Sequence, residues 1–230
     1  MVNNLRVVIA AAGTGSRMKS KINKQYMLLN SRPVLSYSLD VFEKYEAVDE
    51  IVIVAHPRDT EYCEKEIVKK FGYRKVKKVI PGGEQRQDSV WAGLLQLNRD
   101  TTDYVAVHDG ARPLLTSALL TDLIKQAEEW GAAIPGVYAR DTLKMVDRDG
   151  FVGNTLDRSS TVFIQTPQIF RFQEVYQAYE MAREEGFTST DDAALFEKYI
   201  GRVKVVPGNY NNLKITTPED LIIAEALLNM

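Results

Sequence analysis

The chain contains 230 residues, of which 45% are hydrophobic, enough for one large α/β domain with a buried core. Its 29 basic and 31 acidic residues leave a net charge of −2, which excludes the broad basic face that long nucleic acids require. The sequence shows no signal peptide and no apolar stretch approaching the roughly 20 residues that span a bilayer. We therefore expect a cytoplasmic protein that acts on a small charged molecule, with neither a membrane nor a nucleic acid as partner.

Cysteine and histidine are too sparse to suggest a metal centre of the zinc type. The single cysteine, Cys63, can form no disulfide within the chain, which agrees with a reducing compartment, and we assign it no role. The two histidines, His56 and His108, do not combine with it in any spacing typical of zinc ligands.

Apolar runs alternate along the chain with segments of helical periodicity. The predicted strands cover residues 7–12, 51–55, 76–80, 104–108 and 132–137. The predicted helices cover residues 33–45, 59–71, 87–97 and 117–130. This alternation predicts a Rossmann-like α/β fold, with a mostly parallel sheet and helices on both faces. Because no repeat or change of composition marks a boundary, we expect residues 1–230 to form one domain.

Residues 138–161 break this alternation. The segment is polar, alternates as strands do, and contains the turn signal Asp-Arg-Asp-Gly at 147–150. It predicts a protruding β-hairpin, which is marginal in water unless something covers it. A mobile surface excursion would leave five apolar residues partly exposed: Leu143, Val146, Phe151, Val152 and Leu156. We therefore expect the hairpin to be an arm that joins two copies of the chain in a homodimer.

The first predicted strand ends in a glycine-containing loop, Gly13-Thr14-Gly15, whose amide groups could converge on phosphate. Met18 stands where a dinucleotide-binding loop would have its third glycine, and no Gly-Lys-Ser or Gly-Lys-Thr triplet of a Walker loop occurs in the chain. The loop instead brings cations, Arg17 and Lys24, that could meet a nucleoside triphosphate. An ordinary strand-to-helix turn with surface cations beside it is the alternative.

A second polar cluster, His108-Asp109-Gly110-Ala111-Arg112, directly follows a predicted strand. In a parallel sheet Asp109 would face the same crevice as the glycine loop, where its carboxylate could hold Mg²⁺ together with substrate phosphates. Arg112 could bind a second phosphate. The alternative is a helix cap for Asp109, and for His108 we favour a half-buried histidine with its hydrogen bonds satisfied.

Two further segments suit a ligand site, although neither segment alone distinguishes such a site from ordinary structure. The segment from Gly82 to Ser89 follows a strand and opens a helix, which allows close backbone approach to a base or ribose, but a simple turn with a helix cap would look the same. Near the end of the chain, Lys214 is predicted on a short strand before a terminal helix that begins at Pro218.

Taken in order, eight short segments resemble the 2-C-methyl-D-erythritol 4-phosphate cytidylyltransferases of the non-mevalonate isoprenoid pathway. They are AAAGTGSRM, KQY, GGEQRQDSV, VHDGARP, RDTLK, LDR, QTPQ and NLKITTPED, and the resemblance runs from about Leu5 to the terminal helix. The resemblance implies the nucleotide-diphospho-sugar transferase type of α/β fold and a homodimer clasped by the β-arm. It also implies that CMP passes from CTP to a sugar-alcohol phosphate, with release of pyrophosphate and with Mg²⁺ or another divalent cation as cofactor.

The same resemblance implies roles for individual residues. Arg17 and Lys24 match the pair that stabilises the transition state at the α-phosphate, and Arg158 and Lys214 match the pair that positions the incoming phosphate. Because Arg158 lies in the predicted arm, it would serve the site of the neighbouring subunit, together with Thr142 and Arg112. The positions that match the surroundings of CTP are Ala11, Ala12, Gly13, Gly15, Gly82, Ser89 and Asp109. Thr166 and Thr190 would line the alcohol end.

The chain departs from the family where it has Asn23 in place of a frequent proline before Lys24, so the loop loses a fixed φ angle. We predict a loop that is more mobile without ligand. Three other activities remain open: a ribitol 5-phosphate cytidylyltransferase, a non-catalytic nucleotide-binding protein, and a nicotinamide-dependent oxidoreductase. The last is disfavoured by the missing third glycine.

Overall fold

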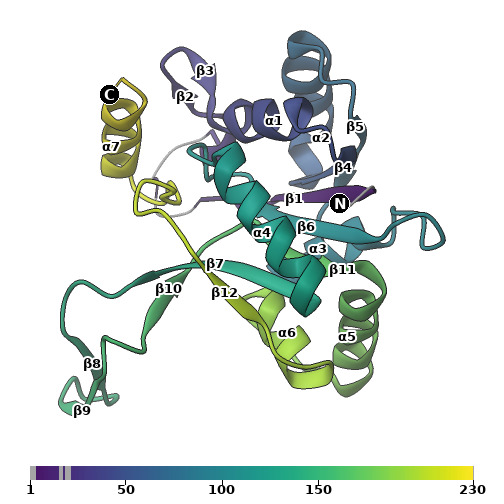
Figure 1. The fold of residues 1–230 in the computed structure, drawn as a ribbon. Helices are drawn as coiled ribbons and strands as arrows, with labels where there is room; N and C mark the ends of the chain where they lie inside the picture. Colours follow the sequence, from purple (N-terminus) through teal and green to yellow (C-terminus); the bar gives the residue numbers. More distant parts are fainter. Residues whose placement is uncertain (1–3, 16–17, 19–21, 230) are drawn as a thin grey trace.

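A computed structural model describes residues 4–15, 18 and 22–229, and its centre is a mixed β-sheet (Figure 1). Within these residues the sheet has eight strands, seven of which follow one another in space. Their order is β10 (Val162–Ile164), β7 (Ala132–Tyr138), β11 (Gln168–Arg171), β6 (Tyr104–Asp109), β1 (Leu5–Ala11), β4 (Val48–Ala55) and β5 (Val76–Pro81). The eighth strand, β12 (Lys204–Pro207), pairs with β7.

The strands of the first half of the chain are parallel, as their apolar sequences predict. β1 pairs with β4 on one side and with β6 on the other, and Leu5, Val7, Val8 and Ile9 are fully buried because both faces of the sheet are covered. β11 and β10 run antiparallel to their neighbours β6 and β7. At the carboxyl end of the parallel strands, Ala10 of β1 lies beside Asp109 of β6, which brings the glycine loop next to the Asp109 cluster.

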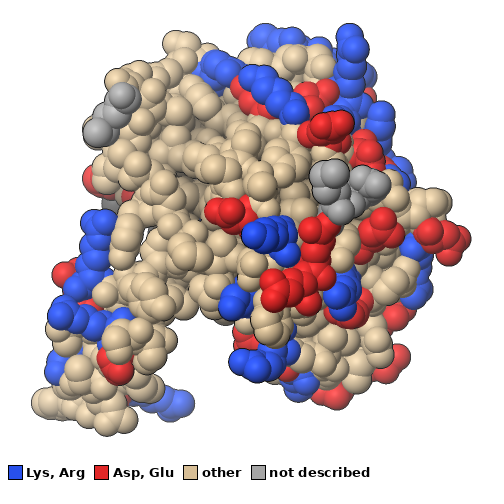
Figure 2. Space-filling model, viewed as in Figure 1, with Lys and Arg blue, Asp and Glu red and all other residues tan. Residues whose placement is uncertain are grey.

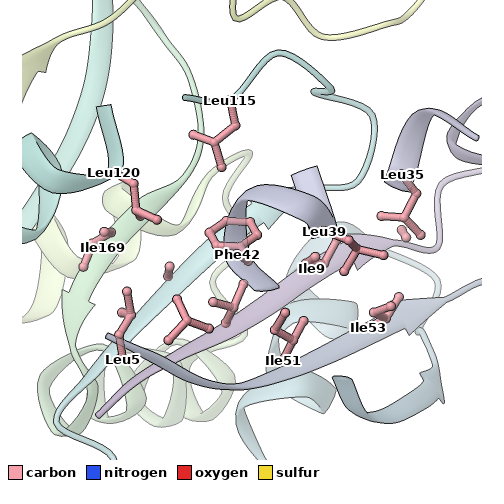
Figure 3. Packing of buried hydrophobic residues seen from close by; sticks show 14 of the residues in the cluster. Leu5, Ile9, Leu35, Leu39, Phe42, Ile51, Ile53, Leu115, Leu120 and Ile169 are labelled. Atoms are coloured by element: carbon pink, nitrogen blue, oxygen red, sulfur yellow. The ribbon is translucent and has the colours of Figure 1, made fainter. Parts of the chain in front are cut away.

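Helices cover both faces of the sheet, as expected. On one face α1 (Val34–Lys44) and α4 (Ser117–Trp130) contribute to a single apolar cluster with the strands. Figure 3 shows Leu39 and Phe42 of α1 close to Ile9 and Ile51 of the sheet within this cluster. On the other face a second cluster joins the strands to three helices, which are α3 (Arg86–Leu94), α5 (Phe172–Glu185) and α6 (Asp192–Tyr199).

The helix α7 (Pro218–Leu228) packs away from the sheet, against a small hairpin made of β2 (Leu28–Leu29) and β3 (Arg32–Pro33). It begins at Pro218, as predicted, with Thr217 and Asp220 forming a capping box. Ile215 and Ala224 are fully buried here together with Leu29, so the end of the chain is anchored beside the glycine loop.

The structure corrects two local predictions. The helix expected over 59–71 is a 3₁₀ turn, Pro57–Asp59, followed by α2 (Thr60–Tyr62) and a π-helix, Cys63–Lys69, before the last helical residues. Lys214 lies in a loop rather than on a short strand, and this loop is held to the Asp109 cluster by the hydrogen bond from Ile215 N–H to the Ala111 carbonyl oxygen (2.9 Å). The Thr216 hydroxyl also donates to the Lys214 carbonyl oxygen (2.9 Å), so side-chain and backbone hydrogen bonds place Lys214 without a strand ladder.

Residues 138–161 contain the predicted hairpin. β8 (Leu143–Val146) and β9 (Val152–Leu156) form a two-stranded sheet that projects from the body of the molecule, at the lower left of Figure 1. The turn is closed by the hydrogen bond from Gly150 N–H to the Asp147 carbonyl oxygen (3.2 Å). Large apolar side chains stand exposed on this arm, with Phe151 71% and Val146 64% exposed. Such a surface is typical of a contact region.

The surface charge matches the composition. Figure 2 shows basic and acidic side chains interspersed on the face it presents. In the part of the chain that the structure describes, no helix has the length and hydropathy to traverse a bilayer.

Candidate active site

A pocket opens at the carboxyl ends of β1 and β6. It is lined by Ala10 to Gly13 from the glycine loop, by Lys24 and Gln25, by residues 83–86 and Ser89 at the start of α3, and by Asp109, Ala111 and Lys214. Of the predicted site residues, seven line this pocket: Ala11, Ala12, Gly13, Lys24, Ser89, Asp109 and Lys214. Segments separated by up to two hundred positions in the sequence thus meet at one edge of the sheet.

Gly15 and Gly82 border the pocket at two positions where a side chain would be costly. Gly15 has φ +63°, a left-handed conformation, and a Cβ there would lie 3.3 Å from Cγ of Lys24. A Cβ on Gly82 would lie 2.5 Å from the Ala12 side chain and 2.7 Å from Oγ of Ser89. The bare backbone at Gly82 therefore lets the loop before α3 close against the glycine loop.

Gln25 connects the glycine loop to the segment that carries Lys24. Its side chain is only 2% exposed, and its Nε2 donates to the carbonyl oxygens of Ala11 (2.5 Å) and Gly13 (3.3 Å). Gln25 was noted only as part of the segment KQY and was assigned no role, because its contacts with the glycine loop join residues that are not adjacent in sequence. Gln25 is buried beneath the loop because the fold places the Lys24 segment beside the end of β1.

Asp109 lies at the centre of a group of cations. Oδ2 accepts a hydrogen bond from Nζ of Lys214 at 2.8 Å, Oδ1 accepts one from Nε of Arg86 at 3.3 Å, and Nε of Arg112 lies 3.7 Å from Oδ2. The carboxylate is 6% exposed. Burial alone would raise the pKa of Asp109, but the surrounding positive charges outweigh it and hold the pKa well below its usual range. Asp109 is therefore ionised and organises three cations around itself.

Arg86 extends this network into the core. Its guanidinium donates from Nη1 and Nη2 to the two oxygens of Asp192 (2.9 and 2.8 Å), and Asp192 also accepts from the hydroxyl of Tyr179 (2.5 Å). Asp192 is fully buried, so its charge depends on these partners. Arg86 was given no role within the GGEQRQDSV segment and Asp192 was missed, because their ion pair joins residues 106 positions apart in sequence.

His108 is fully buried rather than half-buried, and its hydrogen bonds are satisfied as expected. Its Nε2 lies 3.2 Å from the Arg112 carbonyl oxygen, which can only accept, so Nε2 carries the proton. Nδ1 then accepts from the hydroxyl of Thr166 (3.1 Å), which in turn accepts from the Asp109 N–H (3.0 Å). Burial lowers the pKa of His108 to about 4, which keeps the imidazole neutral and this chain of hydrogen bonds intact.

A second pocket adjoins the first and shares Arg86, Asp109 and Lys214 with it. Its other lining residues are Arg112, Ile164, Gln165, Thr166, Gln168, Thr190 and Asp191. Arg112 is held here by the bond from its Nη1 to the Asn212 carbonyl oxygen (2.7 Å), and its Nε has no hydrogen-bond partner among the described residues. Arg112, Thr166 and Thr190 therefore lie in a polar pocket of their own chain, next to the pocket that contains Lys24.

Two predicted site residues lie on the arm, away from these pockets. Arg158 and Thr142 are exposed on the arm, and Arg158 Nη1 only reaches the Arg140 carbonyl oxygen (3.4 Å). Arg112, which we expected to act with them, lies in the pocket and not on the arm. Arg17 falls outside the described residues.

A divalent cation would find one buried carboxylate in the first pocket. Among residues 4–15, 18 and 22–229 there is no cluster of three or more acidic, histidine or cysteine side chains that could hold a metal by themselves. The donor set instead fits an ion such as Mg²⁺ that retains several waters and is shared with substrate phosphates, with Asp109 as the buried carboxylate of the pocket.

Comparison with known proteins agrees with this geometry. The family model described as 2-C-methyl-D-erythritol 4-phosphate cytidylyltransferase, IspD, matches residues 5–230. The enzyme of that name from Caldanaerobacter subterraneus subsp. tengcongensis is 44% identical over 98% of this chain and 99% of its own length. A bifunctional enzyme IspD/IspF from Desulforudis audaxviator is 47% identical, and the match covers 99% of this chain and 57% of that protein.

Solved structures show the same architecture. The crystal structure of 4-diphosphocytidyl-2C-methyl-D-erythritol synthase from Anaerococcus prevotii superposes with a TM-score of 0.86 at 33% identity, over the full length of both chains. The 2-C-methyl-D-erythritol 4-phosphate cytidylyltransferase of Francisella tularensis gives a TM-score of 0.83 at 29% identity, over 97% of this chain and 99% of that one. The chain therefore belongs to the 2-C-methyl-D-erythritol 4-phosphate cytidylyltransferase family and is a CTP-dependent nucleotidyltransferase.

Proposed function

We propose that the first pocket binds CTP, that the adjoining pocket binds 2-C-methyl-D-erythritol 4-phosphate, and that CMP is transferred where the two pockets meet. An oxygen of the sugar-alcohol phosphate forms a new bond to the α-phosphorus of CTP, and the bond from that phosphorus to the bridging oxygen of pyrophosphate breaks. The products are 4-CDP-2-C-methyl-D-erythritol and pyrophosphate. The observation that carries this proposal is the position of Arg86, Lys214 and Asp109, which line both pockets.

The reaction needs positive charge more than it needs a base. A phosphate monoester, with a second pKa near ~6, is already largely a dianion at neutral pH and can attack without losing a proton. The obstacle is the approach of two polyanions, since two like charges 4 Å apart repel by ~4 kcal/mol at an effective dielectric constant of ~20. Fixed cations that neutralise the phosphates and align the attack would therefore supply most of the catalysis.

The described cations divide between the two substrates. Lys24 lines only the CTP pocket, which suits contact with the α-phosphate and the departing pyrophosphate. Arg112 lines only the adjoining pocket, where its guanidinium could bind the incoming phosphate. Lys214 lies between them, and we assign it to the incoming phosphate. Arg17 would bind the departing pyrophosphate together with Lys24; this assignment rests on the family resemblance.

For the base and ribose of CTP we assign the backbone and small side chains around the first pocket. Ala11, Ala12 and Gly13 offer peptide groups at the end of β1, and Gly82 and Ser89 close the opposite side. Ser89 Oγ accepts from the Gly83 N–H (3.2 Å) and donates to the Gln85 carbonyl oxygen (3.1 Å), which fixes the shape of that side. Thr166 and Thr190 of the adjoining pocket would face the alcohol.

We propose Mg²⁺ as the cofactor, carried into the pocket by the triphosphate. Asp109 is the carboxylate that would ligate it, and Lys214, which now donates to Oδ2 of Asp109, would turn to the incoming sugar-alcohol phosphate once the ion is bound. When bound, the ion would neutralise phosphate charge and help orient the triphosphate. The arrangement of Asp109, Arg86 and Arg112 would be the same with and without the bound ion, because Asp192 holds Arg86 from the core.

We further propose that the enzyme is a homodimer joined by the arm. The exposed apolar side chains of β8 and β9 need a covering surface, and the arm also carries Arg158 and Thr142. A second copy of the chain would cover the arm and place Arg158 and Thr142 at the neighbouring subunit's pocket. The location in the cytoplasm stays a prediction from the sequence.

The proposal is tested by pyrophosphate release. The enzyme is supplied with CTP, ATP, GTP or UTP in turn, each with 2-C-methyl-D-erythritol 4-phosphate or with ribitol 5-phosphate. We expect release with CTP and methylerythritol phosphate, accompanied by one equivalent of the CDP-alcohol. Faster release with ribitol 5-phosphate would assign the other cytidylyltransferase activity, and CTP binding without release under any condition would favour a nucleotide-binding protein.

A further inference from the structure

The residues on both sides of Lys24 are fixed to one outer segment, residues 57–63, which does not line either pocket. Lys24 opens a 3₁₀ helix, Lys24–Tyr26, with Asn23 immediately before it. Gln25 holds the inner side of this turn to the glycine loop, as described above. Asn23 and Tyr26 hold its outer side, and both contact the outer segment.

Asn23 makes the first of these contacts. Its Nδ2 donates to Oδ2 of Asp59 at 2.5 Å, in a partly buried position. Its backbone has φ −63° and ψ 138°, so the residue is extended with the φ value that a proline ring would impose. Within the described residues the Asn23 N–H donates no hydrogen bond. The Asn23 carbonyl oxygen accepts from the Tyr26 N–H (2.9 Å), and the side-chain bond to Asp59 adds a second restraint on Asn23 from outside the turn.

Asp59 is well placed to act as an anchor. It ends the 3₁₀ turn Pro57–Asp59, which follows directly on β4. Pro57 stands at the first position of this turn, and Nδ1 of His56 accepts from the Arg58 N–H (3.2 Å). Because the turn is attached to a fully buried strand end at Ala55, the carboxylate of Asp59 is fixed relative to the sheet.

Tyr26 makes the second contact with the same segment. Its side chain is 4% exposed, and its ring meets the ring of Tyr62 edge-on with centroids 5.3 Å apart. The Tyr26 hydroxyl faces the buried thiol of Cys63. The segment from Asp59 to Cys63 therefore contacts the residue before Lys24 and the residue two positions after it.

We propose that Asp59 is a positioning residue for the transfer reaction: through Asn23 it fixes the turn that carries Lys24, so that the ammonium group meets the phosphates of CTP. This inference rests on the function proposed above, because it requires Lys24 to act on the triphosphate. Asp59 touches no substrate and acts only through the Lys24 turn. A displacement of about 1 Å at a catalytic group can cost about 100-fold in rate, so a restraint one residue away is sufficient to affect turnover.

The experiment compares six variants with the wild-type enzyme: Asp59→Ala, Asn23→Ala, the double variant of these two, Asn23→Pro, Asn23→Pro with Asp59→Ala, and Glu61→Ala. Glu61→Ala is the matched control, because it removes an exposed carboxylate from the same segment, and among the described residues Glu61 forms its ion pair with Lys65. For each variant kcat, KM for CTP, melting temperature and amide hydrogen exchange over residues 23–27 are measured.

We expect Asp59→Ala and Asn23→Ala each to lower kcat about 10-fold with KM for CTP changed less than about 3-fold, since only the placement of Lys24 changes. The double variant should be no worse than either single one, because both remove the same bond. Asn23→Pro combined with Asp59→Ala should recover most of the rate, since the ring supplies φ near −65° without the hydrogen bond. Exchange over residues 23–27 should rise in Asp59→Ala and fall again in the proline variant.

Three results would overturn the inference: an unchanged kcat in Asp59→Ala, additive losses in the double variant, or no recovery in the proline variant that still melts as the wild type does. If Asp59→Ala does not fold, Asn23→Ala tests the same bond from its partly exposed end. If the wild-type enzyme itself releases no pyrophosphate, the proposed function fails, whereas amide exchange still reports whether Asp59 restrains the turn.

Discussion

The buried carboxylate of Asp192 provides the sharpest test of how the site is built, through the substitution Asp192→Asn. Asp192 accepts two hydrogen bonds from Arg86 and one from Tyr179 while being fully buried. An amide has a similar shape, but it removes the negative charge and turns an NH₂ group towards Arg86 or Tyr179. Breaking a buried ion pair by removing one partner costs about 3 to 5 kcal/mol. Because Arg86 keeps its bond to Asp109, we expect the lower value, about 3 kcal/mol.

For a chain of this length each kcal/mol lowers the melting temperature by about 2 to 4 °C, so Asp192→Asn should melt about 6 to 12 °C below the wild type. Differential scanning calorimetry measures this loss directly. The control is Tyr179→Phe, which removes one donor to Asp192 and leaves Arg86 paired, and it should cost about 1 kcal/mol. A melting temperature for Asp192→Asn within 2 °C of the wild type would refute the reasoning, because Arg86 would then be held without Asp192.

The remaining predictions concern pH, the arm and the shared site. Burial lowers the pKa of His108 to about 4, below the value of about 6.5 in an unfolded chain, so the unfolded state binds the extra proton and stability is lost as the pH falls through this window. In EDTA-containing buffer the wild type should lose about 2 kcal/mol between pH 6.5 and 5 from this group, and His108→Gln should show a correspondingly flatter profile in urea titrations. Phe151→Asp, at an exposed apolar position of the arm, should convert a dimer into monomers in sedimentation experiments and abolish activity, and a wild type that is already monomeric would contradict the role of the arm. Mixing inactive Lys24→Ala and Arg158→Ala chains should restore about a quarter of wild-type activity, because half of the random dimers contain one intact site, and no recovery would mean that Arg158 serves its own chain or none.

The parts of the fold that could be predicted are those with a continuous local signal. β1 and β6 contain apolar runs, residues 7–11 and 104–107, and their predicted ends lie within two residues of the observed ones. Both faces of these strands are buried, so the runs show no alternation of polar and apolar residues. The position of Asp109 beside the glycine loop followed from the same reasoning, since parallel strands bring their carboxyl ends together. The exposed hairpin was recognisable because a polar segment with a strong turn signal interrupted the helix-and-strand alternation.

What escaped prediction depends on contacts between distant residues. The antiparallel strand β11 and the helix α6 carry no sequence signal that fixes their place, which is set by packing against β6 and β7. Arg86 and Asp192 become partners only when α6 lies across the end of α3. Lys214 was expected on a short strand before the terminal helix, but it lies in a loop whose contacts with Ala111 and Asp109 replace the hydrogen bonds of a strand.

At position 23 the chain has asparagine where the family often has proline, and the residue type alone did not predict how this position is held. The missing ring predicts a more mobile loop, whereas the structure adds a hydrogen bond to Asp59 that the sequence could not reveal across 36 positions. Comparing amide exchange over residues 23–27 in the free and CTP-bound enzyme measures how much mobility remains. Similar exchange in both states would contradict the prediction of a mobile loop.

The central claim is that cations at this pocket accelerate the transfer of CMP and do more than bind CTP. It is tested most directly by measuring single-turnover transfer and CTP affinity in Lys24→Ala. Losing one charge near the reacting phosphates, worth ~4 kcal/mol at an effective dielectric constant of ~20, should slow transfer by about 1000-fold while the Kd for CTP changes by less than about 10-fold. Equal losses in rate and affinity would contradict the account and favour a pocket that only binds the nucleotide.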